Sequence, residues 1–183
     1  YRDGVRVFDV QVEDQLLFDD LDIYREVGAN TALVAQTTVE VQDGALTIET
    51  SSGAQNPKIS AFSIWSTDNV PLPEDFTQLV EAVNAGGAAY TSVDGVAYRA
   101  DDYWGGRRYS NPIEIAGTDD DVLYQSEAVN RSGFEYDIAV ENGTYLVELN
   151  FAEIYHGGHF DGARVFDVLI EDELVFRDLD VFR

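Results

Sequence analysis

The sequence predicts an all-β fold, an antiparallel β-sandwich of jelly-roll type. Short segments of alternating apolar and polar residues follow one another along most of the chain, separated by Gly, Asn and Asp. The one stretch with a helical interpretation, 74–85, follows Pro71 and Pro73, and its apolar spacing is short. Of the 183 residues, 45% are hydrophobic and 12% aromatic, which is enough for one full-sized core.

Three hairpins are predicted within this sandwich. Residues 39–48 alternate around Asp43-Gly44, and residues 134–151 alternate around Asn142-Gly143. Both pairs of turn residues are typical of a tight hairpin turn. The third hairpin is a segment in which Arg-Val-Phe-Asp-Val is followed by a Glu-Asp turn and an apolar run. Because Arg-Val-Phe-Asp-Val is apolar on both faces, it is expected to form a central strand.

That third segment occurs twice, once at each end of the chain. Residues 1–25 match residues 159–183 at a constant offset of 158, with 15 of 25 positions identical. A period of this size equals one ordinary domain, so the chain is interpreted as a window on a tandem array. The expected organisation is the C-terminal part of one repeat at 1–65, a linker at 66–80 and the N-terminal part of the next repeat at 81–183.

A sandwich divided in this way would leave unpaired strand edges in each half. We therefore expect neighbouring copies to complete the two halves, either within a longer chain or by exchange between subunits. The alternative is that the halves close on each other as a rotated single domain, which leaves one copy of the doubled ribbon in surplus.

The charge of the chain limits its partners. The formal net charge is −24, from 35 acidic and 11 basic residues. Nucleic acids and anionic membrane surfaces would repel a chain this negative, so neither is an expected partner. Salt screens this self-repulsion within a Debye length of about 3 Å at 1 M, which favours a halophilic or marine source. Without cysteine or a run of about 18 apolar residues, the sequence predicts neither disulfides nor membrane insertion.

Read in rotated order, from residue 81 to 183 and then from 1 to 65, the chain resembles the malectin family of carbohydrate-binding domains. The motifs that carry the resemblance cover nearly the whole chain apart from the linker. They are AVNAGG at 82–87, DGVAYRADDYW at 94–104, DDVLYQSE at 120–127, NGTYLVELNFAEIY at 142–155 and GARVFDVLIEDELVFRDLDVF at 162–182, followed by VGANTALV at 27–34 and NPKISAFSIW at 56–65.

The resemblance implies a sandwich of the galactose-binding-like kind whose loops at one end bind glycans without catalysis. Tyr109 and Tyr155 match two ligand-contacting aromatic residues of the family. Three positions depart from the family pattern, since Val129 replaces a tyrosine, His156 a phenylalanine and Gln55 an aspartate. A lost ring and a lost charged acceptor each remove on the order of 1 kcal/mol of binding, so the family's sugar specificity is not transferred.

Two further aromatic residues extend the candidate glycan site. Together with His156, Tyr103 and Trp104 offer a rebuilt aromatic platform for a different sugar, although Tyr and Trp are as often core or interface residues. The candidate glycan-binding residues are Tyr109, Tyr155, His156, Tyr103, Trp104 and Gln55.

Metal and catalytic interpretations are weaker. His156, His159 and Asp161 share a Gly-rich loop, but their spacing matches no established metal pattern, and a solvated loop is favoured. The Asp119–Asp121 run suits Ca²⁺, the one cofactor considered, yet a polar turn is the simpler interpretation. Carboxylate pairs such as Asp101-Asp102 and Glu171-Asp172 arise by chance among 35 acidic residues, so no enzyme is expected.

Two functions from different classes follow. The first is a repeated extracellular or cell-surface module that adheres to glycans, where serial weak sites raise avidity. The second is a structural repeat of an extracellular stalk or filament in which the sugar site has decayed. Asn130 and Asn142 fit the N-glycosylation acceptor pattern of secreted proteins, although Asn142 also fits a turn.

Overall fold

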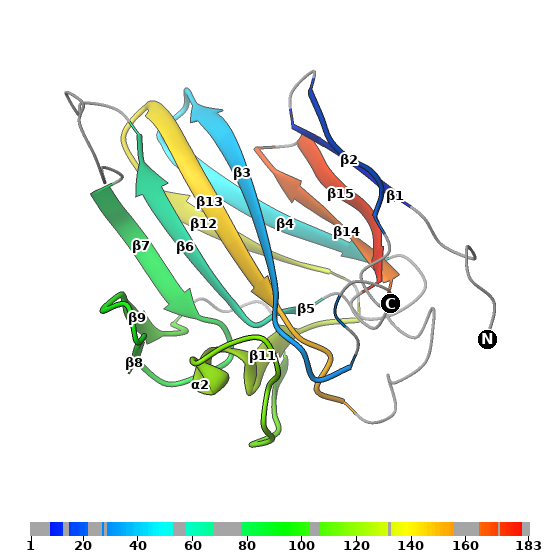
Figure 1. The fold of residues 1–183 in the computed structure, drawn as a ribbon. Helices are drawn as coiled ribbons and strands as arrows, with labels where there is room; N and C mark the ends of the chain where they lie inside the picture. Colours follow the sequence, from blue (N-terminus) through cyan, green and yellow to red (C-terminus); the bar gives the residue numbers. More distant parts are fainter. Residues whose placement is uncertain are drawn as a thin grey trace.

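The computed structural model describes residues 8–12, 15–21, 27, 29–52, 58–67, 78–102, 107–131, 133–155, 165–171 and 173–180. These residues form an all-β sandwich, which confirms the predicted fold class (Figure 1). The elements are β1 (Phe8–Val12), β2 (Gln15–Leu21), β3 (Leu33–Val41), β4 (Ala45–Ser52), β5 (Lys58–Ile59), β6 (Ala61–Ser66), β7 (Gln78–Asn84), β8 (Tyr90–Thr91), β9 (Ala97–Ala100), β10 (Arg107–Ser110), α2 (Asp121–Tyr124), β11 (Ser126–Val129), β12 (Phe134–Ala139), β13 (Gly143–Phe151), β14 (Val165–Ile170) and β15 (Glu173–Asp180).

Two sheets form the sandwich. One has the strand order β12-β4-β14-β15, and the other has the order β3-β13-β6-β7-β9-β8 (Figure 1). All described strand pairs are antiparallel except β7 with β9. A smaller sheet, β10-β11-β5, lies at one end, and β1 pairs with β2 as a separate ribbon. Because β14 lies between β4 and β15, the Val-Phe-Asp-Val part of the second copy is a central strand, as predicted, whereas among the described strands β1 of the first copy pairs with β2 alone.

The core forms between the two large sheets because alternate residues of each strand face inward. Every second residue of β3 and of β12 is buried, and the residues between them are mostly exposed. Aromatic packing joins the sheets where the Phe62 and Tyr136 rings meet edge to face, with centroids 4.8 Å apart. The most buried members of this core include Leu46, Ile48, Ile59, Phe62, Ile64, Val83, Ala85, Val147, Leu149, Phe151, Val168 and Ile170.

Two of the three predicted hairpins are wrong. β3 pairs with β13, whereas β4 pairs with β12 and β14, so the Asp43-Gly44 turn connects two different sheets. The Asn142-Gly143 turn crosses between the same sheets in the same way. The two turns that cross between the sheets are in contact: the Asn142 side chain donates a hydrogen bond to the Gln42 carbonyl. At each of these two turns, packing of the flanking strands in different sheets outweighed local hairpin pairing. The third predicted hairpin is confirmed in β14–β15 and again in β1–β2.

Strands from both predicted half-domains share the large sheets. β13 pairs with β3 and β6, and β4 pairs with β12 and β14. The chain thus adopts the rotated single-domain arrangement, with β1–β2 as the surplus ribbon beside β15 (Figure 1). Strands β6 and β7 extend into the two ends of the predicted linker, of which residues 68–77 lie outside the described part. The division at 1–65, 66–80 and 81–183 stays a prediction about a longer array.

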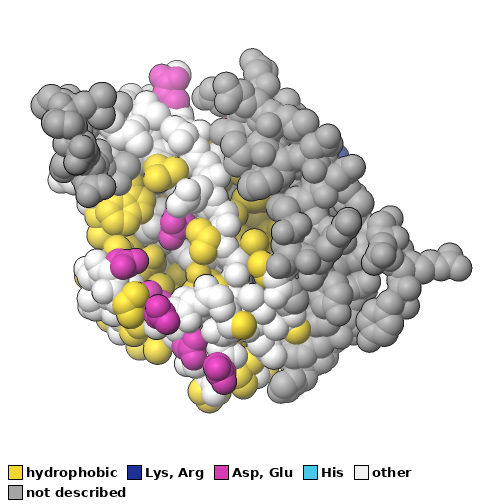
Figure 2. Space-filling model, in the orientation of Figure 1, with side chains coloured by type: hydrophobic (Ala, Val, Ile, Leu, Met, Phe, Trp, Pro, Cys, Tyr) yellow, Lys and Arg dark blue, Asp and Glu magenta, His cyan; other side chains and the backbone are white. Residues whose placement is uncertain are grey.

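The chain segment between β7 and β12 packs on the outer face of the six-stranded sheet and forms a second apolar cluster there. This cluster consists of Ala61, Ala82, Tyr98, Ile115, Leu123, Tyr124, Ala152 and Ile154, with Tyr109 and Ile113 packed against it. Acidic side chains are spread between apolar ones over the described part of the face in Figure 2. No helix in the described residues is long and apolar enough to cross a membrane.

Buried tyrosines make the fold sensitive to alkali. Burial, reinforced by Glu148, raises the pKa of Tyr98 to about 12, and burial followed by the negative charge of Asp101 raises the pKa of Tyr136 above its ordinary value. Burial likewise raises the pKa of Tyr124. In the unfolded chain these phenols lose their protons near pH 10. Between that pH and the raised values the folded state binds more protons than the unfolded state, so stability is present below pH 10 and falls as the pH rises.

We expect the free energy of unfolding to decline above pH 10 by about 1.4 kcal/mol per pH unit for each such tyrosine. Urea titrations at pH 8 to 12 measure this slope. The Tyr136→Phe variant removes one titrating group and is expected to show a shallower decline. A slope equal to that of the unmodified chain would contradict this assignment.

Candidate functional site

Two tyrosines that are 46 positions apart in the sequence meet at one end of the sandwich. Tyr109 lies on β10, and Tyr155 follows β13. Their rings pack edge to face, with centroids 5.5 Å apart and an interplanar angle of 86°. Tyr155 is 45% exposed and Tyr109 is half-buried, so the pair offers aromatic surface to solvent. The Asn111 side chain donates a hydrogen bond of 2.9 Å to the Ile154 carbonyl and joins the two segments.

The small sheet positions Tyr109. β10 and β11 are in register, so Tyr109 lies opposite Glu127 and Arg107 lies opposite Val129. Since alternate residues of a strand share a face, Arg107 lies on the face that carries Tyr109. Val129 in turn lies opposite Lys58 on β5. The small sheet therefore brings an aromatic ring and an exposed guanidinium group beside a group of buried charges.

The buried charges are centred on Lys58, the only lysine in the chain. Its Nζ lies 3.0 Å from Glu127 Oε2 and 3.1 Å from Glu153 Oε2, and all three side chains are fully buried. Lys58 also donates a hydrogen bond of 2.6 Å to the Ala152 carbonyl. Charges this deep in a protein are stable only when they are paired and hydrogen-bonded. We call Lys58, Glu127 and Glu153 the buried triad.

The buried triad connects the segments that carry the two tyrosines. Glu127 is the cross-strand neighbour of Tyr109. Glu153 Oε1 accepts a hydrogen bond of 2.9 Å from the Tyr155 backbone N–H. Lys58 thus binds both glutamates, one beside each tyrosine of the pair. Groups held rigidly in this way keep the two rings in a fixed relative position.

The structure brings together only part of the predicted site. Tyr109 and Tyr155 are in contact, and Val129, which has no ring where the family has a tyrosine, is buried. The other four candidates, Gln55, Tyr103, Trp104 and His156, lie outside the described residues. Sequence analysis missed Arg107 and the buried triad. A signal for the triad was present, because a single lysine in so acidic a chain is unusual.

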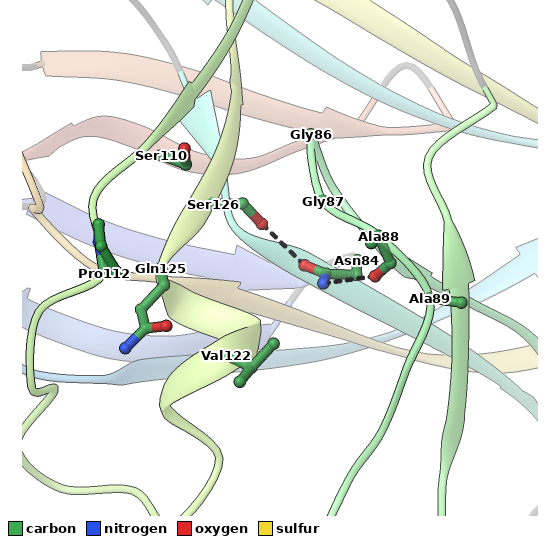
Figure 3. Close-up of a pocket in the computed structure, with 10 residues that line it drawn as sticks. All are labelled: Asn84, Gly86, Gly87, Ala88, Ala89, Ser110, Pro112, Val122, Gln125 and Ser126. Carbon is green, nitrogen blue, oxygen red and sulfur yellow. Dashed lines mark hydrogen bonds between the residues drawn. The ribbon is translucent and has the colours of Figure 1, made fainter.

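A concave pocket of about 380 Å³ lies beside β10 and β11 (Figure 3). The turn after β7 forms one wall, and the ends of β10, α2 and β11 form the other. The Asn84 side chain, at the bottom of the pocket, accepts a hydrogen bond from Ser126 and donates one to the Ala88 carbonyl. None of its lining residues is charged; these are Asn84, Gly86, Gly87, Ala88, Ala89, Ser110, Pro112, Val122, Gln125 and Ser126.

Gly86 brings this turn against β11. Its φ of +68° lies in the left-handed region, where glycine is favoured. A Cβ at this position would collide with the backbone carbonyl of Glu127 and lie 3.0 Å from the amide nitrogen of Ala128. The Gly86 N–H donates a hydrogen bond of 2.8 Å to the Asp101 carboxylate. Close backbone packing at Gly86 therefore fixes β11, the strand that carries one member of the buried triad.

Two residues of the Asp119–Asp121 run have structural partners. Asp120 accepts hydrogen bonds from the Tyr90 hydroxyl and the Val93 N–H, and Asp121 accepts one from the Ile115 N–H. The Asp120 hydrogen bond, together with burial, raises the pKa of Tyr90. No group of three or more potential metal ligands occurs within the described residues. The histidine loop at 156–161 lies outside that part of the chain.

Comparison with known proteins identifies the relatives of this sequence. The malectin domain family matches residues 2–67 and 79–183. The chain is similar to Malectin-A of Xenopus laevis, with 39% identity over 112 residues, which is 57% of this chain and 40% of that protein. It is 33% identical to human Malectin over 135 residues, 70% of this chain and 44% of that protein.

A plant protein shows a more distant similarity. Receptor-like protein 4 of Arabidopsis thaliana is 32% identical over 111 residues, which is 47% of this chain and 18% of that protein. The chain therefore spans less than half the length of each of these relatives. No solved structure matches it.

Proposed function

This chain belongs to the malectin domain family, and we propose that it is a non-catalytic module that binds glycans through the Tyr109–Tyr155 pair. The observation that carries the proposal is the contact between these two rings, because they occupy the positions that match ligand-contacting aromatics of the family. An extracellular or cell-surface location and a role in adhesion belong to the same proposal.

The chemistry of the face suits a sugar. An exposed aromatic ring packs against the C–H side of a pyranose, and polar groups around it hydrogen-bond the hydroxyls. Tyr155 supplies the exposed ring, and Arg107 supplies donors on the face that carries Tyr109. Guanidinium groups donate in a fixed geometry, which favours defined hydroxyl or carboxylate positions. With Val129 in place of a tyrosine, the sugar preference is expected to differ from that of the family.

Replacing Tyr155 by alanine is expected to weaken glycan binding about tenfold, because the exposed stacking surface is lost. A glycan array at high salt identifies the ligand, and calorimetry measures its affinity. High salt screens the repulsion between this acidic chain and anionic glycans.

Two further variants complete this experiment. The Tyr155→Phe variant keeps the ring and is the matched control, with an expected change of less than about threefold. Tyr109→Ala is measured beside it, with an unfolding curve to check the fold, because Tyr109 also packs on the second apolar cluster. Unchanged affinity in both alanine variants, or no glycan bound at any salt concentration, would contradict the proposal.

The second candidate function is a structural repeat of an extracellular filament or stalk, with neighbouring copies of the domain as partners. The duplicated ribbon favours it, since β1–β2 and β14–β15 repeat one structural unit within a single chain. The buried Val129 also favours it, because it leaves no ring at that position. A chain that binds no glycan yet associates with itself in sedimentation experiments would support this function over glycan binding.

A further inference from the structure

The two ribbons of the chain are paired in the same way. In β14–β15, Phe166 lies opposite Leu179 and Val168 opposite Phe176. At the offset of 158, β1–β2 shows the same pairs, Phe8 with Leu21 and Val10 with Phe18, and its other two pairs and both register shifts also coincide with those of β14–β15. Register is set by the residues that pack on each face and by the turn. The two sequences therefore encode one ribbon geometry.

Only one of these ribbons is part of a large sheet. β14 pairs with β4 from Phe166 opposite Ser52 to Ile170 opposite Ile48. The position on β4 that holds β14–β15 is called the dock. The residues that the docked ribbon buries in the core are Val168, Ile170, Val175, Phe176 and Leu179.

A reciprocal pair of hydrogen bonds fixes the turn of the docked ribbon. The Thr47 N–H donates to the Glu171 carboxylate, and the Glu171 N–H donates to the Thr47 carbonyl. Glu171 has a φ of +53°, in the left-handed region that residues with a side chain rarely adopt. One of the two bonds uses the Glu171 side chain, so a carboxylate at this position adds a contact with Thr47 that an apolar side chain could not make.

The sequence of the surplus ribbon meets each of these requirements. Its counterparts to the buried residues are Val10, Val12, Leu17, Phe18 and Leu21, which are identical or similar in volume. Glu13 is the counterpart of Glu171. Volume-conserving apolar exchanges are tolerated well in cores. The apolar residues that the docked ribbon buries therefore have apolar counterparts in β1–β2.

We propose that the dock is shared, and that β1–β2 of the same chain replaces β14–β15 in it. The replacement is local, because β1 already lies beside β15 (Figure 1). Residues 22–32 connect β2 to β3, and 11 residues span up to about 36 Å. A ribbon tethered this closely also has a high effective concentration at the dock, which gives it an advantage over a second copy of the chain.

The exchange changes what the dock is connected to. When β14–β15 occupies the dock, the docked ribbon is connected to β13 through Tyr155 and residues 156–164. When β1–β2 occupies the dock, the docked ribbon is connected to β3 instead. The chain after Tyr155 then no longer leads to a strand that is paired with β4. The two states therefore differ in how the end of the tyrosine-bearing segment is held.

Aspartate substitutions in each ribbon test whether the dock is shared. Val168→Asp places a charge in the core when β14–β15 is docked, and Val10→Asp is the matched change in the other ribbon. We expect V168D to keep a cooperative transition, and we expect V10D to lower the urea midpoint less than V168D does. The double variant is expected to lose that transition. Loss of the transition in V168D alone would overturn the proposal.

The amide signal of Thr47 reports which ribbon is docked. In the unmodified chain, Glu171→Gln is expected to shift this NMR signal, and Glu13→Gln is expected to leave it in place. In the V168D background the two effects are expected to be reversed. A V168D monomer of 20.3 kDa supports docking within the same chain. A species of twice that mass would assign the ribbon to a second copy and overturn the same-chain assignment.

Discussion

Replacing Lys58 by methionine is expected to lower the free energy of unfolding by about 3 to 5 kcal/mol. Methionine nearly matches the length of the lysine stem but removes the ammonium group that lies within 3.1 Å of both Glu127 and Glu153. Both carboxylates are fully buried, so without the cation they face one another in a medium that screens charge poorly. The Ala152 carbonyl also loses its donor.

Urea unfolding at constant salt measures this change. Arg131→Met is the matched control, because Arg131 is exposed and its loss changes the net charge by the same amount. We expect that control to stay within about 0.5 kcal/mol of the unmodified chain. The geometry of the Tyr109–Tyr155 pair, observed by ring-current shifts, should also change in the Lys58 variant if it remains partly folded. Equal stability of the two variants would show that the buried triad does not support the fold.

Replacing Gly86 by alanine is expected to cost about 3 kcal/mol, against about 1 kcal/mol for the same change at Gly95. Both glycines have positive φ values, +68° and +84°, so both substitutions carry a similar backbone penalty. They differ in their surroundings. A Cβ at Gly95 meets nothing within 4 Å, whereas a Cβ at Gly86 collides with the Glu127 backbone. The difference between the variants therefore isolates the cost of displacing β11.

The same pair of variants tests the connection from the turn to the site. Because Glu127 belongs to the buried triad and lies opposite Tyr109, a displaced β11 should weaken glycan binding in Gly86→Ala. Gly95→Ala, which leaves β11 in place, should bind normally. Unfolding midpoints and affinities are measured together on both proteins. Indistinguishable values would mean that β11 accommodates the methyl group by a shift that does not reach the site.

Much of the fold could be predicted from local patterns, but strand pairing could not. The alternation in residues 134–139 and 143–151 correctly placed two strands, and Asn142-Gly143 correctly placed a turn. The same pattern fits a hairpin and a crossing between sheets, because in both cases each strand buries one face. Which strand lies beside Leu46 or Val147 depends on contacts far apart in the sequence.

The candidate site divides in a similar way. Matching motifs identified Tyr109 and Tyr155, but no pattern in the sequence showed that their rings touch. Lys58 is conspicuous as a lone lysine, yet only the folded chain shows that it lies between two glutamates, 69 and 95 positions away. Such ion pairs have no local periodicity, since Lys58 lies on β5, Glu127 on β11 and Glu153 in the segment after β13.

By itself the sequence determined the all-β class, the positions of most strands and the duplication at offset 158, because these depend on residue order and on the two-residue period of a strand. The tertiary structure alone decided that two turns cross between sheets, that the tyrosines meet above a buried triad and that one of two equivalent ribbons lies against β4. These outcomes depend on which distant surfaces bury the most apolar area together while still giving the buried charges polar partners, and that balance exists only in the assembled fold.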